Sequence, residues 1–200
     1  MKPLVKKLII GVAVLAIGAV AGPWVYINLI KEDAPEALKL EPSAATTIVE
    51  ETVESTVQAS AVDGTWAIAT DSIVGYRVKE VIVAQSTEGV GRTSAVQGTL
   101  NIAGEQVTEA QFSVDMTTLK SDSSRRDKQV NTRILDTATY PTATFTLKQP
   151  ITLTPEALAG SDLTTQATGT LTLRGVTKDI ELTLIARLSN DVIEVNGSIE

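Results

Sequence analysis

The chain has 200 residues, enough for one or two domains, and it is 43% hydrophobic, 20% charged and only 4% aromatic. It contains no cysteine and no histidine, which excludes disulfides, Ser-His-Asp or Cys-His nucleophiles, and zinc sites built from those ligands. A net charge of −7 and a pI near 4.7 argue against nucleic acid as a partner, because phosphate binding draws on clusters of Lys and Arg.

The first predicted element is one N-terminal transmembrane helix. Residues 8–30 carry no charge and would span about 34 Å as a helix, against a hydrocarbon core of about 30 Å. Three lysines precede this segment, whereas Glu32 and Asp33 follow it, so the positive-inside rule keeps the N-terminus in the cytoplasm. A cleaved signal peptide is the alternative, because residues 19–21 form a small-residue cleavage pattern. Both interpretations export the rest of the chain.

An acidic segment follows at residues 31–63. It holds eight carboxylates against two lysines, with prolines and many Ser and Thr residues. Such a composition cannot bury enough apolar surface to offset the entropy lost on ordering. We interpret it as a flexible stalk, with a partner-binding tail as the alternative. The predicted organisation is an anchor or signal peptide at 1–30, the stalk at 31–63 and a β domain at 64–200.

From Gly64 onward, apolar residues alternate with polar ones, which is typical of strands with one dry face. About eight such segments occur, and short turns separate them, so neighbouring strands should be antiparallel. The predicted turns are Glu88-Gly89 with Gly91, Ala103-Gly104-Glu105, Arg174-Gly175 and Asn190-Asp191.

The gap between Leu119 and Tyr140 predicts a helical crossover. Arg126, Val130 and Ile134 recur at helical spacing, and Asp122 and Ser123 are candidates for the N-cap. A second short helix is predicted to begin at Thr154, with Pro155 at its first position.

Eight antiparallel strands either close into a barrel or split into a sandwich. A closed eight-stranded barrel has room for one small ligand. In the phase of the apolar residues, Gly98, Gly169 and Gly197 face inward, which indicates either sharp bends or space for a ligand. The predicted lumen is lined by Tyr76, Val78, Gly98, Leu100, Phe112, Val114, Phe145, Gly169, Leu171, Leu182 and Leu184.

Charged residues of the crossover have two interpretations. Arg125, Arg126 and Asp127 could form a lid over a ligand headgroup, but the preferred interpretation is that Asp127 supports the helix N-terminus while Arg126 pairs locally. No two carboxylates form an evident acid–base pair, and no cofactor motif occurs. We therefore expect neither an enzyme nor a metal or cofactor site.

Several motifs in a fixed order carry a family resemblance. They are Trp66 and residues 72–78, 98–100, 126–127, 135–137, 140–145 and 169–178. In these the chain resembles the YceI-like family of polyisoprenoid-binding proteins. The resemblance implies an extended antiparallel β-barrel of lipocalin-like shape. It further implies a long isoprenoid or similar amphiphilic lipid in the lumen, and an exported protein of the bacterial envelope.

The chain departs from this family in two respects. Asp71, Glu80 and Gln129 stand where many members have histidine, and the sequence ends within an alternating segment, so we expect a C-terminal truncation. The edge carrying Val195 and Ile199 would then be unpaired and open to pairing with other molecules, so we expect the chain to aggregate. A homodimer is a candidate assembly.

The predicted function is extracytoplasmic carriage or sequestration of a lipid by a single-pass protein of the cell membrane. The alternative is an exported β-sandwich that binds other proteins and has no small-molecule ligand.

Overall fold

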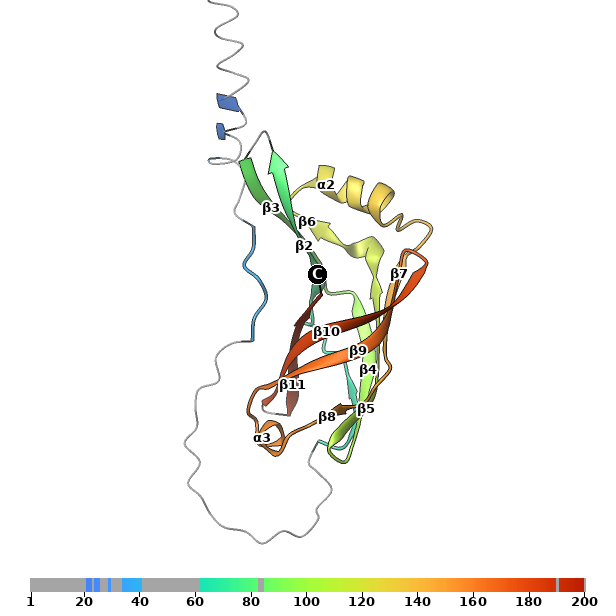
Figure 1. Cartoon of the computed structure of the whole chain (residues 1–200). Helices are drawn as coiled ribbons and strands as arrows, with labels where there is room; N and C mark the ends of the chain where they lie inside the picture. The colour runs from blue at the N-terminus through green and yellow to red at the C-terminus, as the bar shows by residue number, and fades with distance from the viewer. Residues whose placement is uncertain are drawn as a thin grey trace, which may run out of the picture.

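The computed structural model describes most of the chain from residue 62 onward and short pieces before it (Figure 1). The described residues are 21–22, 24–25, 29, 34–40, 62–82, 85–189 and 191–199. The predicted anchor at residues 8–30 and the predicted stalk at residues 31–63 lie largely outside them. Within the described residues, no helix is both long and apolar enough to cross a membrane.

A large antiparallel sheet forms the body of the molecule. Its strands follow the order β1-β4-β5-β7-β9-β10-β11, and the short strand β8 pairs with β5. The strands are β1 (Gly64–Ala67), β4 (Val96–Ala103), β5 (Gln106–Asp115), β7 (Thr142–Leu147), β8 (Ile151–Thr152), β9 (Leu163–Leu173), β10 (Val176–Ser189) and β11 (Val192–Ser198). The all-β, antiparallel prediction is thus confirmed.

A second sheet and the helices occupy one end. The small sheet has the order β2-β3-β6, and its long hairpin projects past the large sheet beside α2 (Figure 1). The bounds are β2 (Val74–Ile82), β3 (Gln85–Thr93), β6 (Lys120–Ser121), η2 (Met116–Thr118), α2 (Ser124–Gln129) and η3 (Val130–Ile134), with α3 (Pro155–Leu158) at the opposite end.

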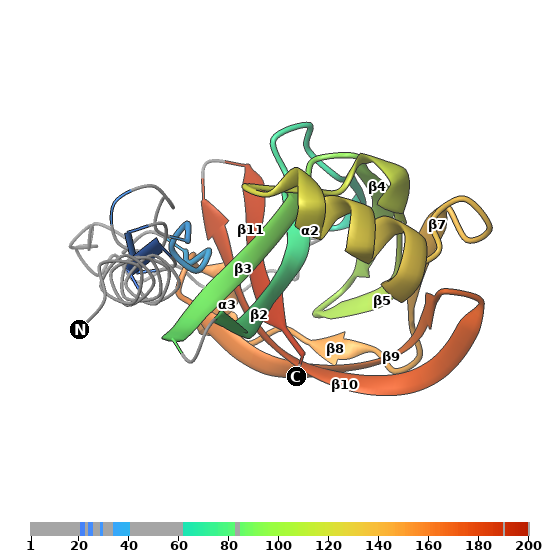
Figure 2. The ribbon, with the colours of Figure 1, turned by 90° about the horizontal axis from the view of Figure 1, so that it is seen from above.

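The predicted closed barrel is wrong in one respect, because the curled sheet is open. The large sheet contains eight strands, but among the described residues no ladder joins β11 to β1 or to the small sheet. Figure 2 shows the large sheet curving round as an incomplete wall. The β2–β3 hairpin extends beyond the end of the large sheet. Its strands pair with each other and with β6 in the small sheet.

Cross-strand register places the apolar positions of the large sheet on one face. Gly98 is opposite Phe112, Phe112 is opposite Phe145, and Phe145 is opposite Leu171. Residues directly opposite in a ladder share a face, and the face alternates along each strand. The alternation in the sequence therefore produces one continuous concave surface over β4, β5, β7 and β9.

Most predicted turns are confirmed. Gly104 lies between β4 and β5 with φ of 63°, and Asp191 lies between β10 and β11 with φ of 61°. Arg174 and Gly175 both have positive φ, 51° and 70°, which suits the twist of the tight β9–β10 hairpin.

One predicted turn is wrong, because Gly89 and Gly91 lie inside β3, and the hairpin closes between Ile82 and Gln85. These glycines instead make room for neighbouring side chains. A β-carbon at Gly89 would lie 2.5 Å from Nε of Arg126, and one at Gly91 would lie 2.3 Å from Cε1 of Tyr76. Because glycines are typical of turns, the sequence did not predict strand β3.

The helical crossover is confirmed, with a change of pitch. Ser123 is the N-cap of α2 and accepts a hydrogen bond from the backbone N–H of Arg126. The next turn, η3, is a π-helix with more residues per turn. Val130, at the start of this turn, is buried as predicted. Because the turn is wider, Ile134 leaves the face of Val130 and is 57% exposed. Thr154 caps α3 as predicted.

Candidate functional site

Two stacked aromatic rings lie at the centre of the concave face. Phe112 on β5 and Phe145 on β7 have centroids 6.3 Å apart and planes inclined by 11°. Both side chains are only half-buried, although they sit in the middle of the sheet. Two neighbouring phenyl rings with partly accessible surface favour contact with a further apolar group.

Glycines flank these rings. A β-carbon at Gly98 would lie 2.7 Å from Cδ1 of Phe112, and one at Gly169 would lie 2.3 Å from Cε2 and Cζ of Phe145. At Gly197, the nearest atoms would be the methyl carbons of Leu184 and Leu182, at 3.0 and 3.1 Å. The inward glycines predicted to hollow the lumen thus accommodate side chains of the same sheet.

Nine predicted lumen residues share the concave face of the large sheet by register. They are Gly98, Leu100, Phe112, Val114, Phe145, Gly169, Leu171, Leu182 and Leu184. The other two, Tyr76 and Val78, lie on β2 of the small sheet, where Val78 is 43% exposed. Whether a ligand contacts these eleven residues remains a prediction.

Protein side chains do not fill this face. Within the described residues, no large side chain is less than 2% exposed. The leucines at positions 100, 171, 182 and 184 are each half-buried. A sheet packed against a second layer would bury such residues fully. The concave face is therefore an apolar trough.

A shallow, open pocket lies elsewhere. Its volume is about 640 Å³, and it is lined by residues that include Ile73, Arg92, Thr93 and Lys120 at the junction of β3, β6 and η2. None of the predicted lumen residues lines it. We base the site on the trough because its apolar face is continuous over several strands.

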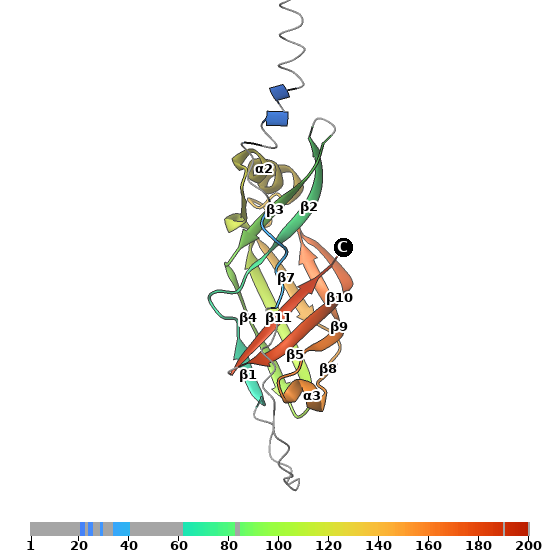
Figure 3. The ribbon, with the colours of Figure 1, turned by 90° about the vertical axis from the view of Figure 1, so that its left-hand side faces the viewer.

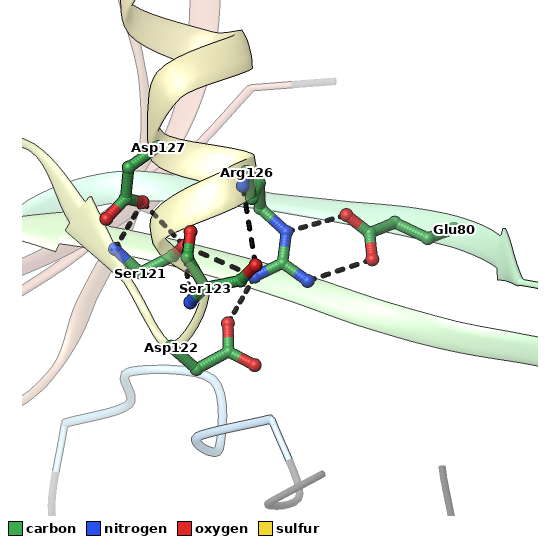
Figure 4. A network of polar contacts seen from close by, with 6 residues as sticks. All are labelled: Glu80, Ser121, Asp122, Ser123, Arg126 and Asp127. Carbon is green, nitrogen blue, oxygen red and sulfur yellow. Dashed lines mark hydrogen bonds and ion pairs between the residues drawn. The ribbon is translucent and has the colours of Figure 1, made fainter. Parts of the chain in front are cut away.

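A polar network joins α2 to the small sheet at one end of the molecule (Figure 4). Arg126 forms a two-pronged ion pair with Glu80 of β2, with Nε–Oε1 2.6 Å and Nη2–Oε2 2.9 Å. Its Nη1 also donates to Asp122 and, at 3.2 Å, to Oγ of Ser121. Asp127 accepts from the backbone N–H and the hydroxyl of Ser121, at 2.9 and 2.6 Å.

Only part of this network could be predicted from the sequence. The local pair of Arg126 with Asp122 is present, but the ion pair with Glu80 joins residues 46 positions apart. Hydrogen bonding to Glu80 raises the pKa of the Arg126 guanidinium; burial opposes this rise, and Asp122 adds to it. Arg126 therefore stays charged and links α2 to the small sheet.

Tyr76 has a buried hydroxyl beside this network. Burial raises the pKa of its phenol, while Ser121 and Arg126 act in the opposite direction. The Ser121 hydroxyl is engaged by Asp127, and the described part of the chain offers the Tyr76 oxygen no hydrogen bond of ordinary geometry.

Replacing Tyr76 with phenylalanine is expected to raise the free energy of unfolding by about 1 kcal/mol at pH 7, because it removes a buried hydroxyl without a partner. The raised folded-state pKa also means that the parent loses stability as the pH rises above 10.0. Urea unfolding at pH 7 and above pH 10 measures both effects. A variant less stable than the parent at pH 7 would show that the hydroxyl is satisfied.

The described residues contain no group of three or more Asp and Glu side chains placed to hold a metal ion. Their carboxylates in this region bind Arg126 and Ser121. The arrangement can hold an apolar molecule in the trough and place polar groups at one end of it.

Comparisons with known proteins agree with this architecture. A family model described as the YceI-like domain matches residues 52–200. A polyisoprenoid binding domain from Saccharophagus degradans has 23% identity and a TM-score of 0.50, with 69% of this chain and 74% of that chain covered. BcnA from Burkholderia cenocepacia has 19% identity and a TM-score of 0.46, with 60% and 72% covered. No curated protein matches the chain in sequence.

Proposed function

The chain belongs to the YceI-like domain family, and from this premise we propose that its trough binds a long isoprenoid or a similar amphiphilic lipid. One observation carries the proposal: the apolar concave face is continuous, and its large side chains, Phe112, Phe145 and four leucines, are only half-buried, whereas smaller residues between them such as Val114 and Ala167 are buried. A soluble domain rarely leaves such a surface uncovered unless a ligand or partner occupies it. The similar domain from Saccharophagus degradans is described as polyisoprenoid binding, which supports the same class of ligand.

The energetics favour a long, flexible, apolar ligand. Each methylene-sized group removed from water contributes about 0.8 kcal/mol. A chain that covers ten such groups would offset several kcal/mol of association cost. Phe112, Phe145 and the half-buried leucines supply the apolar contacts, and the Arg126 network supplies polarity at one end. Binding without catalysis is the activity that we propose.

We place this activity outside the cytoplasm. The proposal rests on the sequence of residues 8–30, which is long enough to cross a membrane, and on the lysines that precede it. The β domain would then take up or hold lipid at the outer surface of the membrane to which it is anchored.

Matched variants on β10 test the ligand site. Leu182 lies on the concave face opposite Ala167, whereas Ile185 points to the other face and is 38% exposed. Leu182→Glu is expected to reduce retention of retinol, a fluorescent isoprenoid, by at least about tenfold, because a charge would enter the trough. Ile185→Glu should retain it, and both variants should first be shown to melt cooperatively.

The native ligand can be identified in parallel. Purified protein extracted into organic solvent should yield an isoprenoid or similar lipid by mass spectrometry. Equal retinol binding by the two glutamate variants, together with an empty extract, would contradict the proposed function. That result would favour the alternative, an exported module that binds protein partners.

A further inference from the structure

A short segment before the β domain is held against it by three side chains. Residues 34–40, here called the strap, lie beside the molecule along a line from β3 towards β11 (Figures 1 and 3). Arg77 of β2 donates to the backbone oxygen of Pro35, and Arg92 of β3 donates to that of Glu36. On the other sheet, the Asn196 side chain donates to the backbone oxygen of Leu38 at 2.7 Å.

These contacts join the two sheets across the open side of the barrel. Arg77 and Arg92 belong to the small sheet, whereas Asn196 lies on β11, the edge strand of the large sheet. Among the described residues, no backbone ladder links these sheets. The strap therefore bridges the side on which the wall is incomplete.

Burial agrees with this placement. Val90 is opposite Arg77 in the hairpin, so the two share a face of the small sheet. Val90 is only 7% exposed, whereas Val81, on the same face nearer the end of the hairpin, is 73% exposed. A covered valine between the two strap-binding arginines indicates that this face has an occupant.

The charges on this face are mixed. By alternation and register it carries Arg77, Lys79, Arg92 and Lys120, together with Glu88, which forms an ion pair with Arg77. The strap contains one acidic residue, Glu36, and one basic residue, Lys39, so its net charge is zero. Docking of the strap therefore depends on the three hydrogen bonds and not on net charge.

We propose that one surface of the molecule is a docking site for the chain's own residues 34–40. This surface consists of the face of the β2–β3 hairpin that carries Arg77 and Arg92, together with the edge of β11. The docked strap slows the passage of lipid through the open side of the barrel. The second part rests on the proposed lipid-binding function. Backbone carbonyls accept all three hydrogen bonds, so the binding depends on the extended shape of the strap more than on its side chains.

Trypsin tests the docking in the full chain, because Lys39 lies within the strap. Cleavage needs a locally released segment, so the docked strap should be cut slowly after Lys39. The double variant Arg92→Ala/Asn196→Ala should raise the Lys39 rate about tenfold, since it removes two of the three hydrogen bonds. Lys79→Ala is the matched control, because it removes a cation from the same face, and it should leave the rate unchanged.

Release of preloaded retinol tests the consequence. The double variant, and a second variant lacking residues 34–40, should both release retinol several-fold faster than the parent, while Lys79→Ala should not. Equal cleavage after Lys39 in the parent and the double variant would overturn the docking. Faster cleavage with unchanged release would overturn the control of lipid passage. Failure of the parent to bind retinol would count against lipid binding itself, and the cleavage assay would still decide the docking.

Discussion

Gly169→Leu should lower the free energy of unfolding by about 2–3 kcal/mol, because β9 has no room for a side chain at this position. A β-carbon there would lie 2.3 Å from two ring atoms of Phe145 and 2.7 Å from the backbone oxygen of Thr146. The ring is itself stacked on Phe112, so it cannot turn aside without losing that contact. Urea unfolding followed by circular dichroism measures the loss.

Two further variants separate overpacking from other causes. Adding Phe145→Ala to Gly169→Leu should recover part of the stability but not all of it, because the Thr146 oxygen remains. Gly197→Ala should cost less than about 1 kcal/mol, since its nearest neighbours are flexible leucine methyl groups at 3.0 and 3.1 Å. Unchanged stability in Gly169→Leu would contradict the packing of Phe145 against β9.

Removing the cation of the polar network should have a comparable effect. Arg126→Met should lower the free energy of unfolding by about 2–3 kcal/mol, because two partly buried carboxylates would lose their shared cation. The Arg126 side chain is 11% exposed, and those of Glu80 and Asp122 are 25% and 27% exposed. We place the loss at or below the range for fully buried pairs because the carboxylates retain some contact with water.

Arg125→Met is the matched control, because Arg125 is the exposed neighbour of Arg126 on α2. Its cost should stay within about 0.5 kcal/mol. Arg126→Lys should fall between the two, since lysine keeps the charge but not the two-pronged geometry. In a double-mutant cycle with Glu80→Gln, the combined loss should be smaller than the sum of the single losses. Equal losses in the two methionine variants would show that the network contributes nothing to stability.

Local features of the fold could be predicted from the sequence. Alternating apolar residues predicted the faces of β4, β5, β7, β9 and β10, because side chains on a strand point to opposite faces in turn. Two helix starts could be predicted from the N-cap residues Ser123 and Thr154, and one turn from Gly175. Each of these residues acts through hydrogen bonds or backbone angles within a few residues. The sequence by itself thus determined most strands of the large sheet, most of the turns and the candidate lining of the trough, but not β3.

Features that join distant parts of the chain required the tertiary structure. Gly89 and Gly91 resemble turn residues until Arg126, Glu80 and Tyr76 are seen to occupy the space beside them. The opening of the sheet depends on where β11 ends relative to the β2–β3 hairpin, and alternation within a strand carries no information on that distance. The ion pair of Arg126 with Glu80 and the bridge from Asn196 to Leu38 likewise connect residues far apart in sequence. Such contacts depend on packing in three dimensions, which no local pattern specifies.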